Sequence, residues 1–296
     1  MAALLARLDL WPVRALWFVL PALVGFGLGD GLAEVSDDVG LTVEVGAWAV
    51  WFVGLVALLA PSTAGLTALR TVSPLAAIGP LAVAALTGTW TGASVGAIGA
   101  GMIVAAVTFL PLVGDRMVNG SAYGPERRMA LRPPAPLMLG PVQLLWVLTV
   151  AGPVLGPLLV ASGRPIVGGI VTVVGLGLAW LGVQRLHQLS RRWVVFVPAG
   201  FVLHDHYALA ESLLMQRPGI ASLGPVPLDK GELLDLTAGS RGVALLVEFV
   251  DDTPLALRAK NEVQGLTVRR ITFTPTLPGE LLREARIRGI KIGVPD

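Results

Sequence analysis

The chain contains no cysteine and only three histidines among its 296 residues. The absence of cysteine excludes disulfide bonds, thiol catalysis and cysteine-ligated metal sites. Charged side chains are also scarce, at 14% of the residues, whereas soluble globular proteins average about 25%. All three lysines lie in the last third of the chain, at Lys230, Lys260 and Lys291. Before them, arginine supplies all the side-chain positive charge.

Long apolar runs fill the part of the chain that is poor in charge, and they end at Arg191-Arg192-Trp193. Beyond this triplet the sequence has ordinary polarity and alternating, strand-like patterns. We therefore predict two domains, a transmembrane helical domain over residues 1–192 and a cytoplasmic β domain over residues 193–296. The β domain carries eight arginines and three lysines, eleven basic side chains against twelve acidic ones. This balance argues against nucleic acid as a partner, despite the high isoelectric point.

Six stretches are long and apolar enough to cross a bilayer, which takes about 20 residues. The first could be mistaken for a signal peptide, but its apolar run is too long and no suitable cleavage site follows it. The sequence therefore predicts an α-helical bundle of about six spans. Their approximate bounds are 14–30, 45–61, 74–90, 93–113, 139–161 and 165–184.

Arginines mark one side of these spans. They occur before the first span, between the second and third, between the fourth and fifth, and after the sixth, whereas the first loop on the opposite side is acidic. Arginine and lysine in short loops favour the cytoplasmic side. We therefore expect a multi-pass protein of the cell (plasma) membrane with both termini in the cytoplasm. The arginines concerned are Arg7, Arg14, Arg70, Arg116, Arg127, Arg128, Arg132, Arg185, Arg191 and Arg192, with Arg164 alone on the other side.

No ionisable residue lies at the centre of a predicted span, which disfavours a proton- or ion-coupled carrier. Small residues at Gly92, Gly96, Ala97 and Gly101 share one face of the fourth span. Such a face fits packing within the bundle, which we favour, or a seam between two copies of the chain. A homo-oligomer that forms through small-residue helix faces is therefore kept as an alternative. The cytoplasmic loop 114–136 is expected to be extended and solvated, with contact to lipid heads or to the β domain as the alternative.

The sequence of the C-terminal domain predicts short strands and a final helix. Two β-rich runs, 193–197 and 201–204, flank the turn Pro198-Ala199-Gly200, and another run covers 212–217. We expect a hairpin of 233–238 with 243–250, the latter a covered central strand, then a turn at 251–253 and strands at 255–259 and 267–274. Pro278 and Gly289 bound the helix, with Leu281, Leu282 and Ala285 as its buried face.

Seven short strands followed by one helix resemble a pleckstrin-homology-like (PH-like) barrel. The segment from Trp193 to Leu203, and the one from Leu214 to Leu223, resemble the opening of bacterial PH-like domains, which commonly follow membrane spans. In composition and in the segment 273–279 the chain also resembles multi-span membrane proteins of actinobacteria. The resemblance implies a small mainly-β barrel that binds or scaffolds. Phosphoinositide binding by PH domains uses basic residues around the first hairpin turn, and Pro198-Ala199-Gly200 has none.

His204-Asp205-His206 is the one cluster of metal-capable side chains. On a strand, His204 and His206 would share a face, but no third ligand with suitable spacing follows, so we favour a solvated strand end over a metal site. No ordered serine–histidine–aspartate relation and no phosphate-binding glycine loop is present. We therefore predict no metal, no cofactor and no enzymatic activity.

The resulting expectation is a non-enzymatic membrane scaffold or assembly factor whose cytoplasmic domain binds a protein partner or the membrane surface. The alternative is a small-solute transporter or channel with a regulatory tail. The lipid bilayer is the expected partner of the spans. For the three arginines near the C-terminus we favour helix-dipole compensation over ligand contact. The candidate contact residues are Arg127, Arg128, Arg132, Arg191, Arg192, Arg283, Arg286 and Arg288.

Overall fold

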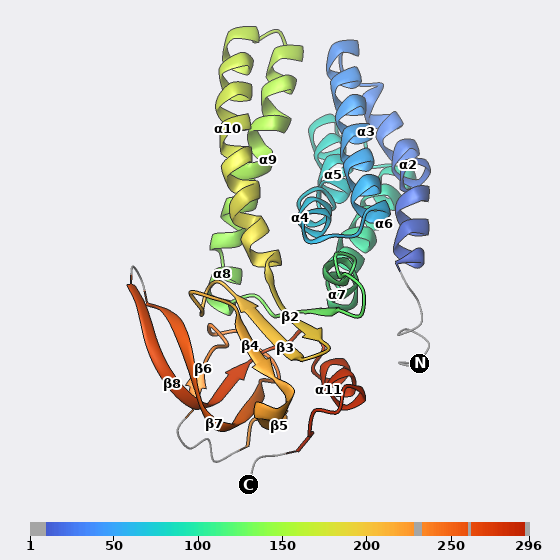
Figure 1. Cartoon of the computed structure of the whole chain (residues 1–296). Helices are drawn as coiled ribbons and strands as arrows, with labels where there is room; N and C mark the ends of the chain where they lie inside the picture. Colours follow the sequence, from blue (N-terminus) through green and yellow to red (C-terminus); the bar gives the residue numbers. More distant parts are fainter. Residues whose placement is uncertain (1–9, 228–232, 260–261, 294–296) are drawn as a thin grey trace. The chain divides into compact units, whose positions relative to one another are not determined.

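The computed structural model describes residues 10–227, 233–259 and 262–293 and divides the chain into two compact units (Figure 1). The membrane unit comprises Met1–Met117 and Gln143–His187, and the β unit comprises Val118–Val142 and Gln188–Asp296. Arg7, Lys230 and Lys260 lie outside the described residues. The β unit thus contains a segment, Val118–Val142, that the sequence prediction assigned to the transmembrane domain.

Helices make up the membrane unit, and five spans among its described residues are long and apolar enough to cross a bilayer. A sixth candidate is a pair of helices that meet at an angle of 57°. These spans mark the chain as a membrane protein. The single-helix spans are α2 (Trp11–Leu32), α3 (Asp37–Leu59), α9 (Pro141–Ala161) and α10 (Pro165–Ser190); α4 (Thr63–Val72) and α5 (Leu75–Thr87) together form the fifth span, and α6 (Gly92–Thr108) with α7 (Pro111–Asn119) is the bent pair.

Several spans differ from the predicted bounds. The second, predicted at 45–61, covers Asp37–Leu59, and the sixth, predicted to end at residue 184, continues to Ser190. The predicted fourth span, 93–113, is interrupted after Thr108, because Pro111 has no N–H to continue the helix and instead begins α7. The predicted third span, 74–90, begins earlier than expected. It includes α4, which starts where the Ser62 hydroxyl accepts a hydrogen bond from the Gly65 N–H at 2.9 Å. Arg70, which we expected in a loop, therefore lies inside a candidate span.

Close backbone contacts hold α2, α3, α5 and α6 together. Gly54 of α3 lies against the buried indole of Trp17, where a Cβ atom would be only 1.9 Å from the ring. The indole N–H of Trp17 donates to the carbonyl of Trp51 at 2.9 Å, and that of Trp51 donates back to Trp17 at 3.0 Å. Trp17 is therefore a core residue of the membrane unit.

A glycine seam joins α9 to α10. A Cβ atom on Gly152 would come within 2.1 Å of the Gly175 Cα, and one on Gly182 would come within 2.0 Å of the Thr149 hydroxyl. Gly156 and Gly168 are also buried in this seam. Small residues let two helices approach closely within a membrane, where dispersion contacts drive packing. Most other side chains of the two helices stay exposed, as expected for surfaces that face lipid.

Two four-stranded sheets form the β unit (Figure 1). Sheet A has the order β1-β2-β3-β4, with every neighbouring pair antiparallel. Sheet C has the order β5-β7-β8-β6, antiparallel except for the short pair β6–β8. The strands are β1 (Arg127–Ala130), β2 (Arg192–Val197), β3 (Gly200–Asp205), β4 (Leu213–Gln216), β5 (Ile220–Pro225), β6 (Leu234–Asp235), β7 (Leu245–Ala259) and β8 (Glu262–Phe273), with the helices α8 (Ala135–Met138) and α11 (Pro278–Ile287).

Strand β1 comes from the loop that the sequence analysis interpreted as solvated. Its four residues pair with β2, from Arg127 opposite Phe196 to Ala130 opposite Trp193. Just beyond it, Leu131 forms an isolated bridge with Pro275, and the Arg132 N–H donates to the Thr274 carbonyl at 2.9 Å. The segment thus lies between strand β2 of sheet A and residues 274–275, which follow β8. Because β1 precedes α9 and β2 follows α10, the helical hairpin is inserted into the sequence of one β fold.

The C-terminal strands confirm part of the prediction and correct another part. The hairpin around residues 198–199 forms, and β7 is a central strand between β5 and β8. The expected hairpin of 233–238 with 243–250 is wrong, because β6 pairs in parallel with β8. The expected turn at 251–253 is also wrong. Those residues continue β7 through a break in register, so that β7 and β8 form one long hairpin.

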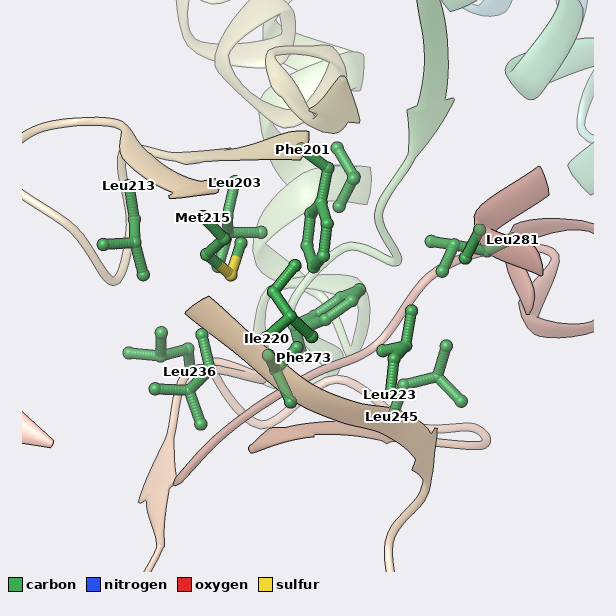
Figure 2. Close-up of a cluster of buried hydrophobic side chains, with 14 of the residues drawn as sticks. Phe201, Leu203, Leu213, Met215, Ile220, Leu223, Leu236, Leu245, Phe273 and Leu281 are labelled. Atoms are coloured by element: carbon green, nitrogen blue, oxygen red, sulfur yellow. The ribbon is translucent and has the colours of Figure 1, made fainter. Parts of the chain in front are cut away.

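The core of the β unit lies between its sheets and includes residues from both of its chain segments. Met129 and Leu131 from the β1 segment join it, with exposed fractions of 2% and 4%. Leu281 and Ala285 contribute the buried face of α11, as predicted, and Gly289 follows the helix at a positive φ of 74°. Figure 2 shows part of this cluster, with side chains from strands of both sheets directed at each other.

Candidate interaction surface of the β unit

Sheet A has one face in the core and one outward face that is largely apolar. In β2 and β3 the buried residues alternate with half-buried ones, so that Val195 and Val202 point outward opposite each other. Leu214 of β4, adjacent to Val202, is 47% exposed. We call this surface the sheet A face and define it by Arg128, Trp193, Val195, Val202, His204 and Leu214.

A stack of three side chains runs across the sheet A face. The guanidinium of Arg128 lies 5.9 Å from the Trp193 ring centre, and Trp193 stacks on His204 with a centre-to-centre distance of 4.7 Å. The Nδ1 atom of His204 is 2.7 Å from the hydroxyl of Ser212. Arg128 also pairs with Glu126 at 3.3 Å. An arginine on an indole face gains cation–π attraction, so this stack orders a flat aromatic surface on three adjacent strands.

Beneath that surface, Arg192 and Asp205 form a buried ion pair. The Nε and Nη2 atoms of Arg192 donate to the two Asp205 carboxylate oxygens at 2.8 and 2.5 Å. The two side chains are 1% and 0% exposed. The remaining guanidinium nitrogen, Nη1, donates to the carbonyl of Arg132 at 2.6 Å, and Asp205 accepts a further bond from the Tyr207 N–H. Such an arrangement satisfies the charges that burial removes from water.

Arg192 is therefore an interior residue, which corrects its place among the candidate surface contacts. The sequence held a signal for this result. A hairpin turn at residues 198–199 puts Arg192 opposite Asp205, and the inward side of β2 continues from Phe196 through Val194 to Arg192. A charged residue that falls on the core side of a strand needs a partner, and Asp205 occupies the matching position on β3.

The His204-Asp205-His206 cluster does not form a metal site among the residues that the structure describes. Asp205 is occupied by Arg192, and His204 is stacked and hydrogen bonded on the outward face. Burial lowers the pKa of both His204 and His206, and the charge of Arg191 lowers them further, while Asp205 opposes the shift. The expected solvated strand end is in fact two half-buried imidazoles that favour the neutral form.

The other candidate arginines lie in two places in the β unit. Arg127 is half-buried on β1 and Arg191, just before β2, is exposed. On α11, Arg283 pairs with Glu280, and Arg288 pairs with Glu284 at 2.7 Å. Arg288 also donates to the Pro125 carbonyl at 2.8 Å, and Arg286 is exposed.

An open hollow of about 390 Å³ lies where the β2–β3 turn meets the end of α11. Two arginines contribute to its lining, but both already have protein partners. Arg217 donates to the Pro198 carbonyl at 2.6 Å, and Arg288 is held by Glu284 and Pro125. The two guanidinium groups of this shallow hollow are therefore already hydrogen bonded within the protein. No aspartate, glutamate, histidine or lysine is among the described residues that line it.

The membrane unit has its own polar cluster around α4. The Thr67 hydroxyl lies 3.0 Å from Nδ1 of His187 in α10, and the indole of Trp146 donates to the Thr71 carbonyl at 2.9 Å. The Arg70 guanidinium lies 5.5 Å from the Phe109 ring centre, and the hydroxyls of Ser73 and Thr108 are 2.8 Å apart. Asp115 of α7 is fully buried. The sequence does not reveal this cluster, because its contacts join residues of α4 to residues of α9 and α10 that lie 75 to 120 positions away.

Comparison of the chain with models of protein families, with curated proteins and with solved structures found no match in any of the three.

Proposed function

We propose that the chain is a membrane-anchored scaffold protein whose β unit binds a protein partner or the membrane surface. The observation that carries the proposal is the pairing of β1 with β2 across the inserted α9–α10 hairpin. A domain that folds from both ends of a helical hairpin is attached to it by two short connections. A regulatory tail that moves to open and close a transporter would instead need a linker, and β2 begins two residues after α10 ends.

The strand order supports a PH-like assignment for the β unit. Strands β1 to β4 follow one another as an antiparallel meander, β5, β7 and β8 form a second meander, and α11 follows. Four strands, three strands and a helix are the order expected of a PH-like barrel. In this assignment the first strand is β1 and precedes the hairpin. The short parallel strand β6 departs from the pattern.

We further propose that the β unit lies in the cytoplasm, because the arginines flanking the candidate spans gather on its side. A phosphatase reporter that is active only outside the cytoplasm tests this orientation. Fused after Asp296 it should be inactive, and inserted after Ser162 in the α9–α10 connection it should be active. The opposite pattern would refute the orientation.

In-cell crosslinking followed by mass spectrometry tests the scaffold function itself. We expect crosslinks from the exposed side chains of the β unit to a reproducible protein or lipid partner. The same experiment on a chain carrying Asp205→Asn, which leaves the buried Arg192 without its counter-ion, should lose these crosslinks because the β unit is destabilised. If the intact chain gives no crosslinks from the β unit beyond background, the proposal fails.

Small-solute transport is the second candidate, and the polar cluster around α4 is the observation that favours it. Ionisable groups within a membrane bundle are costly and often mark a transport path. Close packing of α6 on α5, where a Cβ atom on Gly101 would be 2.2 Å from the Ala76 carbonyl oxygen, favours a structural role. Solute flux into proteoliposomes that disappears with Arg70→Gln, without loss of folding, would favour transport over the scaffold.

A further inference from the structure

The outward face of an antiparallel sheet normally carries polar side chains when it faces water. The sheet A face departs from this rule. Val195, Val202, Leu214 and Trp193 dominate it, and no acidic side chain projects from it. The outward side of sheet C follows the rule, since Glu248 and Arg270 form an ion pair there at 2.7 Å. The difference between the two sheets indicates that the sheet A face is adapted to a less polar surrounding.

Charge around the sheet A face is positive. Arg128 and Arg191 lie on or beside it, and of these Arg128 pairs with the carboxylate of Glu126. Two positive charges against this one negative charge leave a net charge of +1 along the edge of the face. Arginine beside half-buried tryptophan and aliphatic residues is a combination that suits a membrane interface, where cations attract anionic heads and the indole enters the interfacial layer.

The chain connects this face to a candidate span through one intervening residue. Helix α10 has 26 residues and at 1.5 Å per residue is about 39 Å long, whereas the hydrocarbon layer is about 30 Å thick. Its last two turns, which include Gln184, Arg185 and His187, therefore extend into the head-group layer. Strand β2 begins at Arg192 with one intervening residue, and Trp193 is the second residue of that strand.

We propose that the sheet A face docks on the head-group layer of an anionic lipid bilayer, beside the point where α10 leaves the membrane. This inference rests on the proposed function and selects one of its two partners, the membrane surface, for this face. Trp193 and Leu214 enter the interfacial layer, and Arg128 pairs with lipid phosphates. Protein partners are then restricted to the remaining surfaces of the β unit.

The absence of cysteine from the chain allows a direct test. Single cysteines at Leu214→Cys and Val250→Cys are labelled with an environment-sensitive fluorophore in the full chain, reconstituted in nanodiscs of phosphatidylglycerol and phosphatidylcholine. The two sites are a matched pair, apolar and 47% and 44% exposed, one on sheet A and one on sheet C. We expect a quencher attached to lipid heads to quench the label at position 214 and not the label at position 250. Aqueous iodide should give the opposite result.

Two outcomes would overturn the proposal. Equal quenching of both labels by iodide would show that the sheet A face is in water. Protection of the label at position 214 from both quenchers would show that protein covers the face, either another part of the chain or a second copy. In either case crosslinks from the β unit to a partner protein would leave the scaffold function standing, so that the two failures are distinguishable.

Arg128→Gln provides a graded version of the test. An arginine near an anionic membrane surface contributes about 1 kcal/mol, which is about a fivefold change in the ratio of docked to undocked β unit. We expect the quenching at position 214 to fall accordingly, and to fall in the unsubstituted chain when phosphatidylcholine replaces all phosphatidylglycerol. Arg269→Gln, at an exposed position on β8, should have no effect. Quenching that is unchanged by both Arg128→Gln and lipid charge would contradict the role assigned to the arginine.

Discussion

Arg192 and Asp205 show how one pair of residues supports the β unit. Their ion pair is inaccessible to water and connects β2 to β3, while the third guanidinium nitrogen reaches the carbonyl of Arg132, beyond β1. The pair therefore joins the chain segment before the α9–α10 hairpin to the segment after it. Removal of one partner leaves a buried charge without compensation, which costs more than the pair itself contributes.

We predict that Arg192→Leu lowers the free energy of unfolding of the β unit by about 3–5 kcal/mol, because Asp205 is left buried and unpaired. The double variant Arg192→Leu with Asp205→Leu should recover most of this loss. Arg270→Gln is the control, since it breaks the partly exposed pair with Glu248 and should cost only about 0–1 kcal/mol. Chemical unfolding followed by near-ultraviolet circular dichroism measures all three. A loss for Arg192→Leu no larger than the control would contradict the buried pair.

The two histidines beside Asp205 give the β unit a dependence on pH. Burial lowers the pKa of His204 and His206 below the ordinary value of 6.5. The unfolded chain therefore binds protons more readily than the folded chain, and stability is complete above pH 6.5 and falls as the pH drops through the folded-state pKa values. The midpoint of thermal unfolding should decline between pH 7 and pH 5, and His204→Gln with His206→Gln should flatten the decline. An equal decline in the double variant would show that other groups cause it.

At the scale of secondary structure, β1 is the element that changes the interpretation of the chain. The sequence predicts an extended, solvated loop over residues 114–136, which would expose its arginines. In the structure Met129 and Leu131 are core residues, and the backbone around them is bonded to β2 on one side and to residues 274–276 on the other. Strands bonded on both sides are protected from proteases, because cleavage requires local unfolding.

Limited trypsin digestion of the full chain tests this assignment. We expect little cleavage after Arg127 or Arg128, which belong to β1, and early cleavage after Arg241, which is exposed between β6 and β7. A chain carrying Met129→Asp should become sensitive at Arg128, since an unpaired carboxylate in the core destabilises the strand. Early cleavage after Arg128 in the unsubstituted protein, as fast as after Arg241, would restore the solvated-loop interpretation.

The α9–α10 hairpin depends on its glycine seam. Gly175→Ala puts a methyl group 2.3 Å from the Gly152 Cα, whereas Gly177→Ala on the same helix meets nothing within 4 Å. Overpacking of this kind costs about 1–3 kcal/mol, so we expect Gly175→Ala to lower the thermal unfolding midpoint in detergent micelles. Gly177→Ala should leave the midpoint unchanged or raise it slightly, because alanine is the better helix former. Equal effects of the two substitutions would argue against the seam.

The sequence predicted these elements unequally, for physical reasons. The spans were found because a bilayer requires about 20 apolar residues in succession, a local signal. The break before Pro111 and the inclusion of α4 were missed, since α4 is short and amphipathic and its polar side chains face other helices. Strand β1 was missed because four residues that include two arginines carry little local pattern, and its partner β2 lies more than 60 residues away.

The candidate site was likewise predictable only in part. Arg128 and Arg191 lie near the outward surface, as their charge suggests. That Trp193 and Leu214 share this surface with them follows only from the pairing of the strands. Arg192 was assigned to the surface by charge alone, although strand alternation placed it inward. Pairings between distant segments, such as β6 with β8, leave no local trace in a sequence, and the predicted hairpin of 233–238 failed for that reason.

In the whole molecule, one β fold is completed across an inserted pair of membrane helices. Its two chain segments must then lie on the same side of the bilayer, because α9 and α10 together cross it twice. The same architecture gives an order of assembly, since β1 cannot pair with β2 before the hairpin between them has been synthesised.

A disulfide between β1 and β2 tests whether the two chain segments form one β fold. Arg128 and Val195 are directly opposed in the register, at a pair without mutual hydrogen bonds, where the separation of about 4.5 Å between Cα atoms suits a disulfide. In the otherwise cysteine-free chain, Arg128→Cys with Val195→Cys should form a disulfide rapidly in native membranes under mild oxidation, detected by mass spectrometry of linked peptides. Arg128→Cys with Val250→Cys should not. Failure of the first pair to link, or equal linking of both, would contradict the two-segment β fold.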